Sequence, residues 1–205
     1  MDGRPLATST PYPARHALRP PFLVLLLTAW LIAVAGGSSW AATIYGGKWQ
    51  QLETRHAVLL FESREVLDLF AGKIRYDRRR DPAAHLLVPS DETGDNGITE
   101  KIDALFMRVQ EILDMRRKME KVTIKIYPDT GSLRDVYQRL FRSKDAMRAW
   151  YLYEKNTIYV TVADVHEGML AHEMAHAIID HFFSVRPPSA TAEILARYVD
   201  KHLTR

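Results

Sequence analysis

The segment HEMAH at residues 172–176 has the HExxH pattern, in which two histidines lie one helical turn apart. Two imidazoles at this spacing can bind one zinc ion. The chain of 205 residues contains no cysteine, so a metal site would have to use histidine and carboxylate ligands. A catalytic zinc site takes three protein ligands and leaves one position open. A third ligand must therefore come from elsewhere in the chain.

The HEMAH segment lies inside an amphipathic pattern at 165–183 that predicts a helix. Residues advance by about 100° along a helix, so His172 and His176 are about 40° apart on its surface. Glu173 and Asp180 fall on the same polar side. The opposite arc is apolar and contains Gly168, Ala171, Met174, Ala175, Ile178, Ile179 and Phe182. Such a helix can bury one face and turn the polar stripe toward a cleft.

No third histidine is suitably placed near this helix. Metzincins have a histidine six residues after the second one and a glycine between, but this chain has Phe182 and Ile179 there. His181 and His166 lie on other arcs of the helix and cannot share a metal ion with His176. The metzincin class is therefore excluded.

Glu193, 17 residues after His176, is the candidate third ligand. It lies in a second predicted helix at 189–203, which can fold back on the first because Arg186-Pro187-Pro188 forms a turn. One face of this helix carries Ala192, Leu195, Ala196, Val199 and Leu203, and another carries Glu193, Arg197 and Asp200. The alternative is a surface glutamate that pairs with Arg197 four residues later.

The stretch HEMAHAIID followed by AEILARYVD resembles the gluzincin metallopeptidases, the thermolysin-like group with HExxH and a later helical glutamate. It is most similar to small bacterial peptidase-MA-like proteins, in which a stretch like EGLAEYV follows HExxH. ETRHAVLLFES and YLYEKNTIYV also fit that group. The detailed similarity covers 149–200, with a looser one from 52 to 127.

This resemblance implies an exported zinc-dependent peptidase acting on a peptide or protein substrate. His172, His176 and Glu193 would bind Zn²⁺. Glu173 would be the general base that accepts a proton from the attacking water and delivers it to the departing amine. The strand at 157–162 would form the edge of the cleft, where a substrate peptide could add as a further strand.

Two features depart from the family pattern. Thermolysin-like enzymes have an aspartate four residues after the ligand glutamate, where this chain has Arg197. Asp180 and Asp200 are therefore the candidates to hold a histidine ligand in place. The larger enzymes also have a further domain that supplies an oxyanion-stabilising histidine or tyrosine, whereas 12 residues follow Glu193 here. The candidate replacements are Tyr151, Tyr153, Tyr159 and Tyr198.

A non-catalytic envelope protein of the same fold, containing zinc or binding peptides, is the alternative function. It is favoured by the short segment after Glu193, whereas the intact Glu173 favours an enzyme. A partner protein that completes the cleft would reconcile the short segment with activity.

The first 41 residues have the pattern of a secretory signal peptide. Three arginines precede an apolar run at 22–35, and small residues then lead to a cleavage site after Ala41. The run is shorter than the roughly 20 residues that a membrane-spanning helix needs, although anchoring of the protein by residues 22–35 is the alternative. We therefore expect a periplasmic or secreted protein.

The remaining residues, 42–205, fit a single domain. Without residues 1–41 the net charge falls from +3 to about +1, which gives no support for a nucleic-acid partner. The order of elements predicts an α+β fold, and the resemblance implies a minimal zincin-like domain, with a small mixed sheet and an edge hairpin packed on helices. The predicted strands are 55–62, 122–127, 149–154 and 157–162; the predicted helices are 64–75, 98–118, 132–142, 165–183 and 189–203, and 77–97 is an exposed loop.

Overall fold

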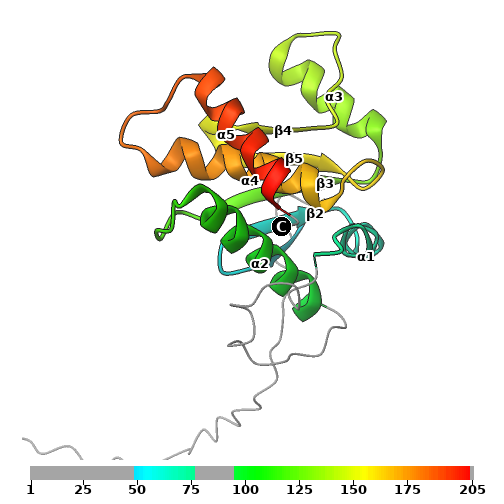
Figure 1. Cartoon of the computed structure of the whole chain (residues 1–205). Helices are drawn as coiled ribbons and strands as arrows, with labels where there is room; N and C mark the ends of the chain where they lie inside the picture. Colours follow the sequence, from blue (N-terminus) through cyan, green and yellow to red (C-terminus); the bar gives the residue numbers. More distant parts are fainter. Residues whose placement is uncertain (1–48, 77–94, 204–205) are drawn as a thin grey trace, which may run out of the picture. The chain divides into compact units, whose positions relative to one another are not determined.

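The computed structural model describes residues 49–76 and 95–203, which all belong to one compact unit. These residues form a mixed five-stranded sheet and five α-helices, so the predicted α+β class is confirmed (Figure 1). The predicted signal segment at 1–41 and most of the predicted loop at 77–97 lie outside the described residues. Among the described helices, none combines the length and the apolar character needed to cross a membrane.

The sheet has the strand order β1-β2-β3-β5-β4. The central strands β2, β3 and β5 run parallel to one another, and the outer strands β1 and β4 each pair antiparallel with their neighbour. The sequence predicted four of these strands, whereas β1 was not predicted. Their bounds are Gln50–Glu53 (β1), Ala57–Phe61 (β2), Val122–Tyr127 (β3), Ala149–Leu152 (β4) and Thr157–Thr161 (β5).

The expectation that a substrate peptide could add as a further strand to the strand at 157–162 is wrong, because this strand is already paired on both sides. That segment is β5, which lies between β3 and β4 and has every residue buried. The edge is β4, the other strand of the predicted hairpin. In a hairpin at the edge of a sheet, only one of the two strands also pairs with the rest of the sheet. The alternation of side chains along β5 does not reveal which of the two strands this is. Both faces of β5 are covered, as is usual for an inner parallel strand.

The five α-helices follow the predicted pattern with shifted ends. Between β4 and β5 the chain also forms a short 3₁₀-helix, Tyr153–Lys155 (η3). The α-helices are Arg64–Lys73 (α1), Asp95–Leu113 (α2), Thr130–Phe141 (α3), Glu167–Phe182 (α4) and Ser189–His202 (α5).

Helix α2 ends at Leu113 and not at residue 118 as predicted. Asp114, the next residue, has a φ of 53° in the left-handed region, which terminates a helix. The side-chain amide of Gln110 then donates to the carbonyl of Arg117 at 3.0 Å and holds the chain in its new direction. The apolar spacing also stops at Leu113, and in the predicted extension to residue 118 only Met115 is buried.

Two apolar clusters cover the two faces of the sheet. The larger contains buried side chains of α1, α2, α4 and α5 together with one face of the central strands. The smaller lies on the other face under α3 and is built on Tyr127, Leu133, Trp150 and Tyr159. The helices that carry the HExxH pattern and Glu193 therefore belong to the larger core.

A carboxylate of α2 holds the turn between β1 and β2. Asp103 Oδ1 accepts hydrogen bonds from Thr54 Oγ1 at 2.8 Å and from His56 N at 2.9 Å, and its Oδ2 accepts from Arg55 N at 3.0 Å. Thr54 Oγ1 in turn accepts from Ala57 N at 2.9 Å. One half-buried side chain thus satisfies three donors of a tight turn.

We predict that Asp103→Ala lowers the free energy of unfolding by about 2–4 kcal/mol, because it leaves these donors without their charged acceptor. Urea denaturation measures the change. The matched control is Asp68→Ala, which removes an exposed i,i+4 pair with Arg64 and should cost less than about 0.5 kcal/mol. Equal, small losses in the two variants would show that Asp103 does not support the turn.

Candidate metal centre

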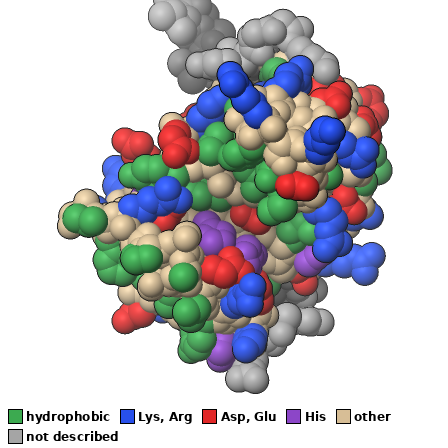
Figure 2. Space-filling model, turned by 90° about the horizontal axis from the view of Figure 1, so that it is seen from above, with side chains coloured by type: hydrophobic (Ala, Val, Ile, Leu, Met, Phe, Trp, Pro, Cys, Tyr) green, Lys and Arg blue, Asp and Glu red, His purple; other side chains and the backbone are tan. Residues whose placement is uncertain are grey.

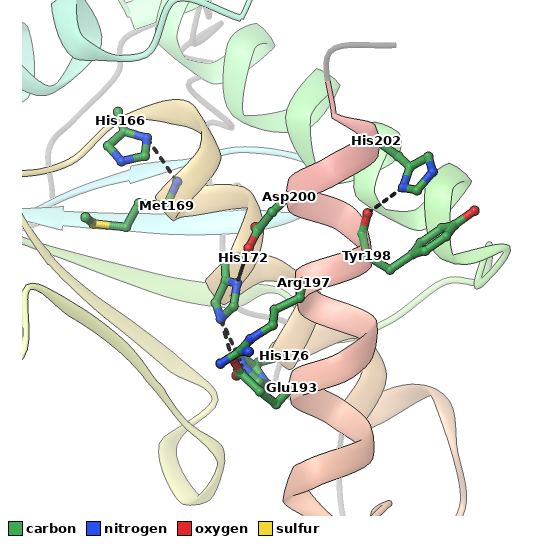
Figure 3. Close-up of polar contacts among 9 residues, drawn as sticks. All are labelled: His166, Met169, His172, His176, Glu193, Arg197, Tyr198, Asp200 and His202. Atoms are coloured by element: carbon green, nitrogen blue, oxygen red, sulfur yellow. Dashed lines mark hydrogen bonds and ion pairs between the residues drawn. The ribbon is translucent and has the colours of Figure 1, made fainter.

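Helices α4 and α5 place the candidate ligands. The side chain of His166 caps the start of α4 by accepting a hydrogen bond from Met169 N at 3.2 Å (Figure 3). Helix α5 begins directly after Pro188, and a proline just before a helix prevents the preceding helix from continuing into it. The chain therefore turns between the two helices, and α5 packs against α4.

Three side chains converge between these helices (Figure 3). The Nε2 atoms of His172 and His176 are 3.3 Å apart. Glu193 Oε2 lies 3.6 Å from His172 Nε2 and 3.4 Å from His176 Nε2. All three residues are partly exposed, and together they could hold a metal ion. The structure thus brings together the three ligand candidates that the sequence analysis named.

The spacing of these atoms fits a tetrahedral zinc site. Zinc binds imidazole nitrogen and carboxylate oxygen at roughly 2.0–2.2 Å, so two ligand atoms on one tetrahedron are separated by roughly 3.3–3.5 Å. The three observed separations, 3.3, 3.4 and 3.6 Å, fall at or next to this range. Little rearrangement of the side chains is needed for one ion to contact all three.

Asp200 on α5 orients His172. Its Oδ2 lies 3.0 Å and its Oδ1 3.3 Å from His172 Nδ1 (Figure 3). When Nδ1 carries the proton, its N–H group donates a hydrogen bond to this carboxylate. The lone pair of Nε2 is then available for a metal ion. The other candidate, Asp180, lies instead against Arg186, whose Nε and Nη2 are each 2.8 Å from its Oδ2.

The candidate base Glu173 is buried beside the three ligands. Burial is the main reason that its pKa is raised to about 7, and the nearby carboxylates of Glu193 and Asp200 add to this shift. The charge of His172 and a hydrogen bond with the Tyr151 backbone oppose it. A carboxyl group with a pKa near neutral pH is suited to accept and return a proton.

The protonation of the ligands favours metal binding. Burial lowers the pKa of His176, and the neighbouring His172 lowers it further, so its imidazole is neutral at pH 7. A hydrogen bond from Arg197 is the largest cause that lowers the pKa of Glu193, so this carboxyl is ionised. Neutral imidazole and ionised carboxylate are the forms that bind metal ions.

The observed contacts of the four tyrosines considered as oxyanion donors are with residues other than the three ligands. The Tyr151 hydroxyl lies 2.7 Å from His181 Nε2, and the Tyr153 ring stacks on the same histidine at 5.2 Å. Tyr159 packs in the smaller core under α3. Tyr198 stacks on the last histidine of α5 and points away from the three ligands (Figure 3).

One contact of this site had no signal in the sequence. The backbone of Tyr151, on the edge strand β4, bonds Glu173, and a backbone group has no residue-specific signature. The contact shows that β4 lies next to the candidate base. On the surface, histidine side chains lie beside acidic ones in a shallow hollow (Figure 2).

Comparisons with protein-family models, with curated proteins and with solved structures find no match for this chain. The functional assignment therefore rests on the chemistry of the side chains and on their arrangement.

We predict that Asp200→Ala weakens zinc binding about 10- to 100-fold, because His172 loses the acceptor that fixes its ring and tautomer. Competition with a chromophoric chelator measures the affinity. The zinc affinity of Asp200→Asn should lie between those of the parent and the alanine variant, since the amide oxygen can still accept a hydrogen bond from Nδ1. Lys201→Ala, the neighbouring exposed position on α5, should bind like the parent; a parent-like affinity for Asp200→Ala would remove this role from Asp200.

Proposed function

We propose that this protein is a zinc-dependent peptidase of the gluzincin type, built on a minimal zincin-like domain. The observation that carries the proposal is the convergence of His172, His176 and Glu193 within 3.3–3.6 Å of one another. The buried Glu173 beside them supports an enzyme, because a purely structural zinc site does not need a nearby carboxyl with a raised pKa. Export to the periplasm or the medium, predicted from residues 1–41, belongs to the same proposal.

A zinc ion held by the three ligands would supply an activated water of lowered pKa and would polarise the scissile carbonyl group. Glu173 accepts the proton of the attacking water and then delivers it to the departing amine. Asp200 keeps His172 oriented during this sequence. No serine or cysteine nucleophile is required, which agrees with the absence of cysteine.

The edge strand β4 is the element along which a peptide substrate would bind. Within the described residues its outer side pairs with no other strand, so its backbone groups can bond an extended peptide. The bond between the Tyr151 backbone and Glu173 brings this strand next to the proposed base. A peptide on β4 would therefore pass close to the three ligands.

The second candidate function is a zinc-containing or peptide-binding envelope protein that does not cleave its ligand. The observation that favours it is that the contacts of the four tyrosines are with residues other than the three ligands. An oxyanion donor from a partner protein would restore the enzymatic function.

The two functions differ in the effect of Glu173→Gln. For a peptidase, we predict a loss of hydrolysis of about 10²- to 10⁴-fold, because an amide cannot accept the proton of water. Zinc content and folding should be retained, since the amide oxygen can still accept the bond from the Tyr151 backbone. Cleavage of a fluorogenic peptide library by the zinc-loaded protein measures the loss.

Glu154→Gln is the matched control, because Glu154 is an exposed glutamate of η3 and its substitution should leave the rate unchanged. A zinc-loaded parent without activity toward any library member would favour the binding function. Equal rates for the parent and Glu173→Gln would exclude Glu173 as the base.

A further inference from the structure

The two carboxylate oxygens of Glu193 have different partners. Oε2 faces the histidines, at 3.6 Å from His172 Nε2 and 3.4 Å from His176 Nε2. Oε1 accepts a hydrogen bond from Arg197 Nε at 2.6 Å, one turn further along α5. The guanidinium group lies beside Glu193 and below His172 (Figure 3). One oxygen is therefore directed to the metal centre, and the other is held by an arginine.

We propose that Arg197 is a positioning residue that limits Glu193 to coordination through a single oxygen. The inference rests on the proposed zinc site. A carboxylate can bind a metal ion through one oxygen or both, and the second oxygen of an unrestrained glutamate competes for the open position. Arg197 withholds that oxygen, so the protein supplies three ligand atoms and leaves room for water and substrate.

The contribution of Arg197 lies in geometry and not in stability. Its side chain is 70% exposed, and exposed i,i+4 ion pairs contribute little to folding. A short bond between two charged groups is nevertheless directional. The planar guanidinium group also loses little freedom on binding a carboxylate, in contrast to the flexible ammonium group of lysine.

Helix α5 then carries the ligand together with two residues that orient ligands. Glu193, Arg197 and Asp200 follow one another at intervals of four and three residues and share one face. Arg197 holds Glu193, and Asp200 holds His172. The arginine at the position where thermolysin-like enzymes have an aspartate thus has a role of its own, while Asp200, one turn later, contacts the histidine.

Cobalt(II) substitution tests this inference, because the intensity of visible absorption by cobalt decreases as its coordination number rises. We expect an intense, four-coordinate spectrum from the purified protein loaded with cobalt. Arg197→Ala should bind cobalt and retain its far-ultraviolet circular dichroism, but with a much weaker visible band. Arg197→Lys should recover part of the band, since a lysine at i+4 can still contact Oε1.

Lys201→Ala, which removes another exposed cation of α5, should have the spectrum of the parent. Peptidase activity, where present, should fall about 10- to 100-fold in Arg197→Ala through kcat. Identical intense bands in the parent and Arg197→Ala would overturn the role of Arg197 and leave the metal centre intact. A weak band already in the parent would also overturn it. A parent that binds no cobalt would overturn the proposed zinc site itself, and the inference with it.

Discussion

Helix α5 must pack closely against α4 for Glu193 to reach the histidines, and every feature of the candidate centre depends on this packing. Contacts of His176 with Glu193 and of His172 with Asp200 show that the two helices run antiparallel. Both helices bury small side chains: Ala171 and Ala175 of α4 and Ala192 and Ala196 of α5 are at most 3% exposed. Small side chains allow two helices to approach closely, which brings short carboxylate side chains within reach of imidazoles.

The charges gathered at this interface favour a bound cation. Three carboxyl groups, from Glu173, Glu193 and Asp200, lie near two imidazoles. Arg197 contacts the carboxylate of Glu193. Burial, and to a smaller extent the nearby carboxylates of Glu193 and Asp200, raises the pKa of Glu173. A divalent ion would lower this pKa again by attracting the ionised form. A metal ion bound here would therefore be coupled to the proposed base, and the three side chains could hold such an ion.

The sequence predicted the part of the site that depends on one helix or on two consecutive helices. Helical spacing placed His172 and His176 on one stripe, and the short turn before α5 made Glu193 available. The same reasoning could not separate Asp180 from Asp200, because both share a face with candidate ligands. The choice depends on the relative register of α4 and α5, which brings Asp200 to His172 and leaves Asp180 to Arg186.

Long-range pairing explains the errors in the fold. The alternating residues of 157–162 predicted a strand, but its inner place in the sheet is decided by pairing with β3, about 30 residues earlier. Strand β1 was not predicted because its four residues, QQLE, have little strand character and depend on pairing with β2. Helix α2 was predicted to continue past Leu113, where its apolar spacing stops, because nothing in the sequence marks the left-handed conformation of Asp114.

The zinc content of the purified protein, compared with His172→Ala and Glu193→Ala, tests the central claim most directly. We predict about one tightly bound zinc ion per chain in the parent and its loss or strong weakening in both variants. Elemental analysis after reconstitution and removal of free metal gives the stoichiometry. A parent that retains no zinc, or a Glu193→Ala variant that binds zinc as tightly as the parent, would contradict the three-ligand site.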